Sequence, residues 1–146
     1  MNVLKPSLIN YNSTPLSKIH PIMKVAIDSG TTGHTFPTSF DGGNHNPNHT
    51  TCKVNTAAGK VMESKATDTF RFVGDTEHHH CTKFDEVTIP LASLGTICRK
   101  KQVIGIFDDV NGRLFDKKTM RMVAKADLDL SNNLYMAEVI CVDEGD

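Results

Sequence analysis

The sequence predicts an all-β domain with at most one short helix. Residues 67–73 place Asp68, Phe70 and Phe72 on one side and polar or small side chains on the other, the period of a strand with one buried face. Glycine-containing turns separate further extended segments, as in β-hairpins. Helical spacing of apolar residues occurs only in residues 91–101. The length of 146 residues suits one domain with a modest core.

The first half of the chain divides into an arm, a strand, a loop and a hairpin. Residues 1–20 are rich in Pro, Ser and Asn, which predicts a flexible arm or linker. A first strand is expected over residues 23–27, and the Asn/Gly/Pro-rich residues 35–51 indicate a surface loop. Extended segments 51–56 and 60–63 then flank Ala57-Ala58-Gly59, a hairpin turn in which the glycine can take a positive φ.

The second half predicts a short helix and another hairpin. Pro90 suits the first turn of a helix, and Leu91, Leu94 and Cys98 would share one of its faces. Residues 102–110 and 113–115 are expected to pair through an Asn111-Gly112 turn of type I′. We therefore expect a main lobe over 21–110 and a C-terminal β extension of the same domain over 111–146.

A carboxylic acid, a small hydroxyl residue and a glycine follow the first strand as Asp28-Ser29-Gly30, and Thr31 comes next. The acid can exchange protons with a water molecule, and the hydroxyl can bond across to a partner strand. The glycine allows a tight turn and leaves room for a substrate. This order indicates the catalytic carboxylate of an aspartic protease, and the alternative is a plain turn at the end of a strand.

One chain supplies one such acid. The triplets that begin at Asp68 and Asp75 lack the glycine, so the sequence holds no second copy of the motif. The chain is also too short for two protease lobes. A site with two carboxylates would therefore need two copies of the chain, which predicts a homodimer.

Charge and composition argue against several other classes of partner. The formal net charge of -1 gives no basic surplus, so direct nucleic-acid binding is not expected. No apolar stretch is long enough for a membrane helix, and the first residues lack the apolar run of a signal peptide. We therefore expect an intracellular, cytoplasmic protein without a membrane partner, whose four cysteines are reduced packing residues.

Three blocks of the sequence resemble the protease of copia-type retrotransposon polyproteins. The first is residues 25–34, in which a histidine, His34, follows the Asp-Ser-Gly motif. The second, residues 89–98, is similar to an apolar-Pro-Leu stretch that ends in Leu-Cys in those proteins. The third comprises residues 103–107 and the later Leu134-Tyr135. The order and spacing of the three blocks carry more weight than any one of them.

This resemblance implies a retropepsin-like closed β-barrel lobe that acts as a homodimer and cleaves a polyprotein or peptide substrate. Asp28 would be the catalytic acid, and Ser29, Gly30 and Thr31 would complete its motif. Residues 54–62, with Ala57, Ala58 and Gly59 at the tip, would form a flap over the substrate. Such an enzyme needs no metal and no organic cofactor. It would act in the cytoplasm, including inside virus-like particles of the element.

The sequence departs from the family pattern after Gly30 and in the second block. Thr31 stands where copia proteins usually have alanine, and the Leu-Leu-Ser pattern appears as Leu91-Ala92-Ser93. The main alternative is therefore a non-catalytic relic or domesticated β-barrel that serves as a dimeric binding module. An unrelated β domain with a coincidental turn is a second alternative.

Histidines supply the rival chemistry. The run His78-His79-His80 followed by Cys81 suggests zinc, but further ligands at a suitable spacing are missing, so we expect a solvated polar loop. His45 and His49 lie in Pro/Asn-rich segments and are expected on the surface. For His34, a structural hydrogen bond near the active-site loop and simple exposure both remain open.

Overall fold

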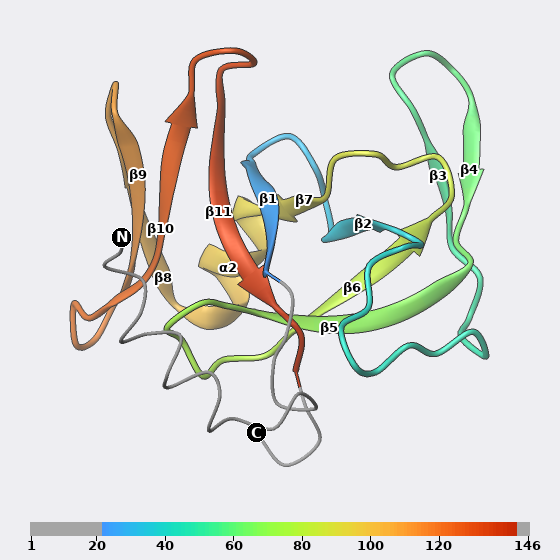
Figure 1. The fold of residues 1–146 in the computed structure, drawn as a ribbon, viewed down its shortest axis with the longest axis horizontal. Helices are drawn as coiled ribbons and strands as arrows, with labels where there is room; N and C mark the ends of the chain where they lie inside the picture. The colour runs from blue at the N-terminus through green and yellow to red at the C-terminus, as the bar shows by residue number, and fades with distance from the viewer. Residues whose placement is uncertain (1–21, 143–146) are drawn as a thin grey trace, which may run out of the picture.

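The structure is a computed structural model that describes residues 22–142, and it consists mainly of strands with one short helix (Figure 1). The arm expected over residues 1–20 lies outside the described residues. In chain order the elements are β1 (Ile22–Asp28), β2 (Thr35–Pro37), β3 (Lys53–Asn55), β4 (Val61–Glu63), β5 (Ala66–Phe72), β6 (His79–Phe84), β7 (Leu91–Ser93), α2 (Leu94–Lys101), β8 (Val103–Phe107), β9 (Asn111–Asp116), β10 (Met122–Asp129) and β11 (Leu134–Ile140).

Six strands close into a barrel in the order β1, β7, β2, β6, β5, β11, because β11 pairs back with β1. β1 runs antiparallel to β11, with Ile22 opposite Ile140, and parallel to β7, with Asp28 opposite Ser93. The expected all-β closed barrel with one short helix is thus confirmed. The closure also means that the segment expected as a C-terminal extension supplies β11, a strand of the barrel itself.

The remaining strands extend this sheet or stand apart from it. Residues 134–137 of β11 pair with β10, whereas Val139 and Ile140 pair with β5. The strands β10, β9 and β8 therefore continue the sheet beyond the barrel. β3 and β4 form a separate two-stranded sheet. In Figure 1 this hairpin and the β10–β11 hairpin rise on the same side of the barrel, which is the side where β1 ends.

Aromatic side chains fill the barrel. Phe36, Phe70 and Phe72 are almost fully buried, and the rings of Phe36 and Phe70 stack with centroids 4.7 Å apart. The alternation expected for residues 67–73 is confirmed, since every second residue of β5 is buried. Burial of each phenylalanine contributes about 1.5–3 kcal/mol, so these rings account for much of the packing energy.

The single described helix begins later than the sequence predicted. Residues 91–93 form β7 instead of helix, because the backbone of Pro90 and Leu91 pairs with Ala26 of β1. The hydroxyl of Ser93 then caps the helix by accepting the N–H of Thr96 at 3.2 Å. The prediction that Pro90 lies in the first helical turn is therefore wrong.

The prediction of a type I′ turn at Asn111-Gly112 is also wrong, since both residues belong to β9. The turn comes earlier, where the Asp108 carboxylate accepts the N–H groups of Val110 and Asn111 at 2.8 Å each. Gly112 serves packing instead, because a Cβ there would lie 2.3 Å from the ring of Phe107. The glycine is required by a neighbouring ring and not by a turn.

Two segments that were expected to be surface loops contribute to the core. Within residues 35–51, Phe36 of β2 and Phe40 are buried. The histidine run is not a solvated loop either, because His79 and His80 belong to β6 and His79 is 5% exposed. No helix in the part of the chain that the structure describes is long and apolar enough to cross a membrane.

Candidate active site

Asp28 ends the strand β1 at the rim of the barrel. The three apolar residues before it, Val25 to Ile27, are buried and hold the strand in the core, while Asp28 itself is half-buried. Ser29 and Gly30 are exposed. The carboxylate therefore has a rigid strand behind it and an open side toward solvent, which a group that activates a bound water requires.

The turn after Asp28 closes on the carboxylate. The N–H of Gly30 donates to Oδ1 of Asp28 at 2.7 Å. A Cβ at position 30 would lie 3.3 Å from this same oxygen, which is a tight contact. Glycine therefore lets the backbone approach the acid closely and fixes the orientation of its side chain.

Two hydroxyl groups tie the rest of the loop to the neighbouring elements. Ser93, at the end of β7, donates from its Oγ to the carbonyl oxygen of Thr31 at 2.8 Å. Thr96, in the first turn of α2, donates from its Oγ1 to the carbonyl oxygen of Thr32 at 3.1 Å. The loop that follows Asp28, residues 29–34, is thus fastened to a segment more than sixty residues away in the sequence; we call it the Asp28 loop.

His34 completes this attachment from inside the barrel. Its ring is 7% exposed, and its Nδ1 accepts the backbone N–H of Ser93 at 2.9 Å. The ring also packs edge-on against Phe70, with centroids 5.1 Å apart. Of the two interpretations left open by the sequence, the structural hydrogen bond is the one present.

The hairpin expected over residues 54–62 is present as β3 and β4. Val54 lies opposite Met62 in its ladder, and the N–H of Gly59 donates to the carbonyl oxygen of Thr56 at 2.9 Å across the tip. Gly59 has φ of 83°, as the sequence predicted. Ala57, Ala58 and Gly59 are all exposed, and a Cβ at Gly59 would meet no atom within 4 Å.

The base of this hairpin is fastened by residues that the sequence analysis missed. Ser64 is buried, and its Oγ accepts the N–H of Cys52 at 2.8 Å. The Nε2 of His49 lies 2.7 Å from the same oxygen, so this histidine is an anchor and not a free surface residue. An exposed tip on an anchored base is the arrangement that a closing hairpin needs.

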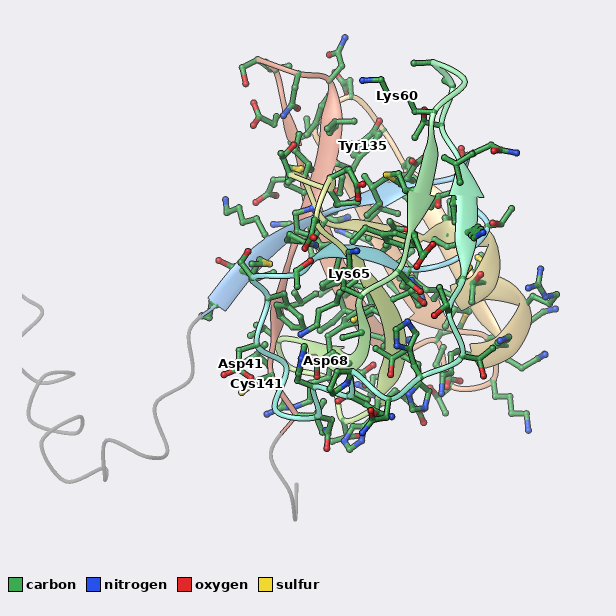
Figure 2. The ribbon with its side chains drawn as sticks, turned by 90° about the vertical axis from the view of Figure 1, so that its right-hand side faces the viewer. Asp41, Lys60, Lys65, Asp68, Tyr135 and Cys141 are labelled. Atoms are coloured by element: carbon green, nitrogen blue, oxygen red, sulfur yellow. The ribbon has the colours of Figure 1, made fainter. Side chains whose placement is uncertain are left out.

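A buried ion pair also escaped the sequence analysis. Lys83 of β6 donates to Asp68 of β5 at 2.9 Å, and both side chains are almost fully buried. Burial raises the pKa of Asp68, but the hydrogen bonds from Lys83, Gly42, Thr69 and Asn44 outweigh it and hold the pKa below its usual value. Figure 2 shows Asp68 at the far end of the molecule from Lys60 of the hairpin tip, so this network is structural.

The loop residues expected in the site, Asp28, Ser29, Gly30 and Thr31, lie together at the rim of the barrel, and the hairpin tip stands on a separate element on the same side (Figure 1). Within residues 22–142 no three His, Cys, Asp or Glu side chains gather in a way that could hold a metal ion. The four cysteines are free thiols, of which Cys52 is exposed and does not pack in the core.

Comparison of the chain with protein-family models, with curated proteins and with solved structures found no match.

Proposed function

We propose that the chain is an aspartic endopeptidase of a copia-type retroelement, which forms its active site from Asp28 of two copies and processes the polyprotein of the element. The observation that carries the proposal is the Asp28 loop: a half-buried acid at the end of a barrel strand, oriented by the Gly30 amide and fastened by Ser93. The exposed tip of the β3–β4 hairpin supports the same function, because a cleft in such an enzyme needs a cover.

The catalytic step follows from the repulsion between two carboxylates. When two Asp28 side chains lie about 3 Å apart, they cannot both ionise readily, so the pair keeps one proton. The ionised carboxylate takes a proton from a water molecule, whose oxygen then attacks the scissile carbonyl carbon. The protonated carboxyl gives its proton to the carbonyl oxygen. Collapse of this tetrahedral intermediate breaks the C–N bond: the carboxyl that took the water proton passes it to the amine nitrogen, and the other carboxylate takes a hydroxyl proton from the intermediate, which restores the singly protonated pair.

Ser29 has a role in this assembly. Its side chain is exposed and makes no hydrogen bond to residues 22–142 of its own chain, whereas Ser93 and Thr96 are already engaged. The Ser29 hydroxyl is therefore available to bond across to the second copy beside the paired acids. A partner at this position would bring the two loops together without disturbing the bonds that hold each of them.

The proposal is tested by cleavage of peptides derived from the polyprotein. Asp28→Asn should keep the fold and abolish cleavage, because an amide cannot accept the proton from water. A pepstatin-type inhibitor should block the wild-type protein, which separates its activity from that of contaminating proteases of other classes. Cleavage that persists in Asp28→Asn would overturn the proposal. A stable dimer that binds peptides without cleaving them would instead support a binding module.

A further inference from the structure

The hydrogen bond between Ser93 and His34 defines the protonation state of the histidine ring. A backbone N–H can only donate, so Nδ1 of His34 must accept and carries no proton. In a neutral imidazole the proton then resides on Nε2. The carbonyl oxygen of His34 also accepts the N–H of Thr82 at 2.9 Å, so the residue is held on both sides, by β7 and by β6.

We propose that His34 is a positioning residue whose neutral ring latches the Asp28 loop to β7, and that protonation of the ring releases this loop in acid. The proposal rests on the proposed function, since it assigns to the latch the task of holding the catalytic acid in place.

Protonation of the His34 ring and its hydrogen bond to Ser93 cannot occur together, because both use Nδ1. Because Nε2 already bears a proton, a second proton must bind to Nδ1. That nitrogen would then be a donor that faces the N–H of Ser93, 2.9 Å away. Two donors cannot share a hydrogen bond, so the charged ring must leave its place. The loop segment that ends at His34 would move with it.

The groups around His34 disfavour its charged form. His79 and His80 face it from β6, and Lys100 and Lys101 face it from α2. Burial and then these positive or titratable groups lower the pKa of His34 to about 4. A pocket of about 140 Å³ is lined by His34 and these residues together with His78 and Thr96, and it gives solvent a route to the ring.

The second buried histidine has a different set of neighbours. His79 packs against His34 with ring centroids 5.6 Å apart. Burial and Lys101 lower the pKa of His79, Asp75 and Glu77 oppose this shift, and His78 adds to it, with the result that its pKa lies at about 4. Among the described residues, His79 makes no hydrogen bond to residues 28–34, so its protonation would destabilise the region without breaking the latch itself.

The expected size of the effect follows from the two states of the ring. In the latched state the pKa of His34 is about 4, and in a released ring it returns to 6.5. Release should therefore become about 30-fold more favourable between about pH 7.5 and about pH 5, because only the released ring binds the proton in this range.

Amide hydrogen exchange measures this directly, without substrate. In the full chain, the protection factor of the Ser93 amide, corrected for intrinsic exchange, should fall about 30-fold from about pH 7.5 to about pH 5. His34→Asn offers an acceptor near the position of Nδ1 that does not titrate, so its Ser93 protection should stay constant. His34→Phe offers no acceptor and should be unprotected at both pH values.

Two matched variants keep the test specific. His80→Asn removes an exposed histidine of β6, and His79→Phe removes the buried neighbour while keeping an aromatic ring. Both variants keep the acceptor at Nδ1 of His34, so the Ser93 protection should still fall in acid, but by less than in the wild type because each variant loses a group that lowers the pKa of His34. The proposal is overturned if the Ser93 protection falls equally in wild type and His34→Asn. It is also overturned if nitrogen NMR of the ring finds the proton on Nδ1 near neutral pH.

Cleavage assays separate this proposal from the proposed function. If both hold, wild-type kcat should fall between about pH 7.5 and about pH 5 more steeply than that of His34→Asn, with a smaller change in KM. If the Ser93 protection depends on pH but the protein cleaves no peptide, the latch is supported and the protease function is contradicted. If the protein cleaves peptides but kcat falls equally toward acid in wild type and His34→Asn, the protease function is supported and the latch is contradicted.

Discussion

Ser93 donates from its hydroxyl to the carbonyl oxygen of Thr31 at 2.8 Å, across 62 residues of sequence. The Oγ of Ser93 also accepts the N–H of Thr96 at 3.2 Å and so caps α2. One buried side chain thereby starts a helix and fastens the loop that carries the candidate catalytic acid. The stability of the helix and the position of the acid depend on the same group.

Ser93→Ala should therefore lower both stability and activity. Loss of the cap and of one buried hydrogen bond should reduce the free energy of unfolding by about 1–3 kcal/mol, measured by urea unfolding. The kcat for peptide cleavage should fall more than in Thr96→Val, which removes only the bond to the Thr32 carbonyl. Equal kcat values in Ser93→Ala and wild type would contradict the role given to Ser93.

Lys83→Met should destabilise the fold strongly, because it leaves the Asp68 carboxylate buried without its partner. We expect a loss of about 3–5 kcal/mol in urea unfolding. Lys101→Met is the matched control, since it breaks an ion pair with Glu77 that is partly exposed, and it should cost about 0–1 kcal/mol. Similar losses for the two variants would show that the Asp68–Lys83 pair is not the buried support described.

Gly59 and Gly74 provide a matched pair for the flap. Both have positive φ, and a Cβ at either position would meet no atom within 4 Å. Alanine at each should cost about 1 kcal/mol of stability for the same backbone reason. Only Gly59→Ala should also reduce cleavage, and Gly59→Pro should reduce it further, because proline fixes φ near -65° and removes the N–H.

Amide exchange at the tip checks the same assignment from the other direction. The amides of Ala57 and Ala58, which are exposed, should exchange fast in the free protein and slow markedly with a peptide-mimicking inhibitor. A tip that is already protected without inhibitor would contradict the flap assignment, as would an equal loss of cleavage in Gly74→Ala.

Global stability should fall in mild acid. The pKa of each of the buried residues His34 and His79 is lowered from 6.5 to about 4, so the unfolded chain binds more protons in between. Their stabilising contribution is complete above pH 6.5 and is lost as the pH falls toward 4, by at most about 3 kcal/mol for each histidine. In urea unfolding, His79→Phe should flatten this part of the pH profile; a profile as steep as that of the wild type would refute the assignment.

Local patterns predicted the elements that depend on local chemistry. The apolar run before Asp28 gave a buried strand, the alternation in residues 67–73 gave β5, and Gly59 marked a hairpin tip. Each of these follows from the period of a strand or from the conformational freedom of glycine.

The elements that were missed depend on partners distant in the sequence. Leu91 belongs to a strand because β1 pairs with it, and His79 is buried because Phe70 stacks on its ring with centroids 5.1 Å apart. Gly112 looked like a turn residue, although the ring of Phe107 is what excludes a side chain there. The Asp68–Lys83 pair joins two strands, and neither residue alone signals a buried charge.

The central claim, that one active site takes Asp28 from two chains, is tested most directly by mixing. Wild-type protein and Asp28→Asn should be combined at constant total concentration and allowed to exchange subunits before cleavage is measured. If both acids are required, activity should follow the square of the wild-type fraction, and an equal mixture should retain about a quarter of it. Activity that falls in simple proportion to the wild-type fraction would contradict the claim.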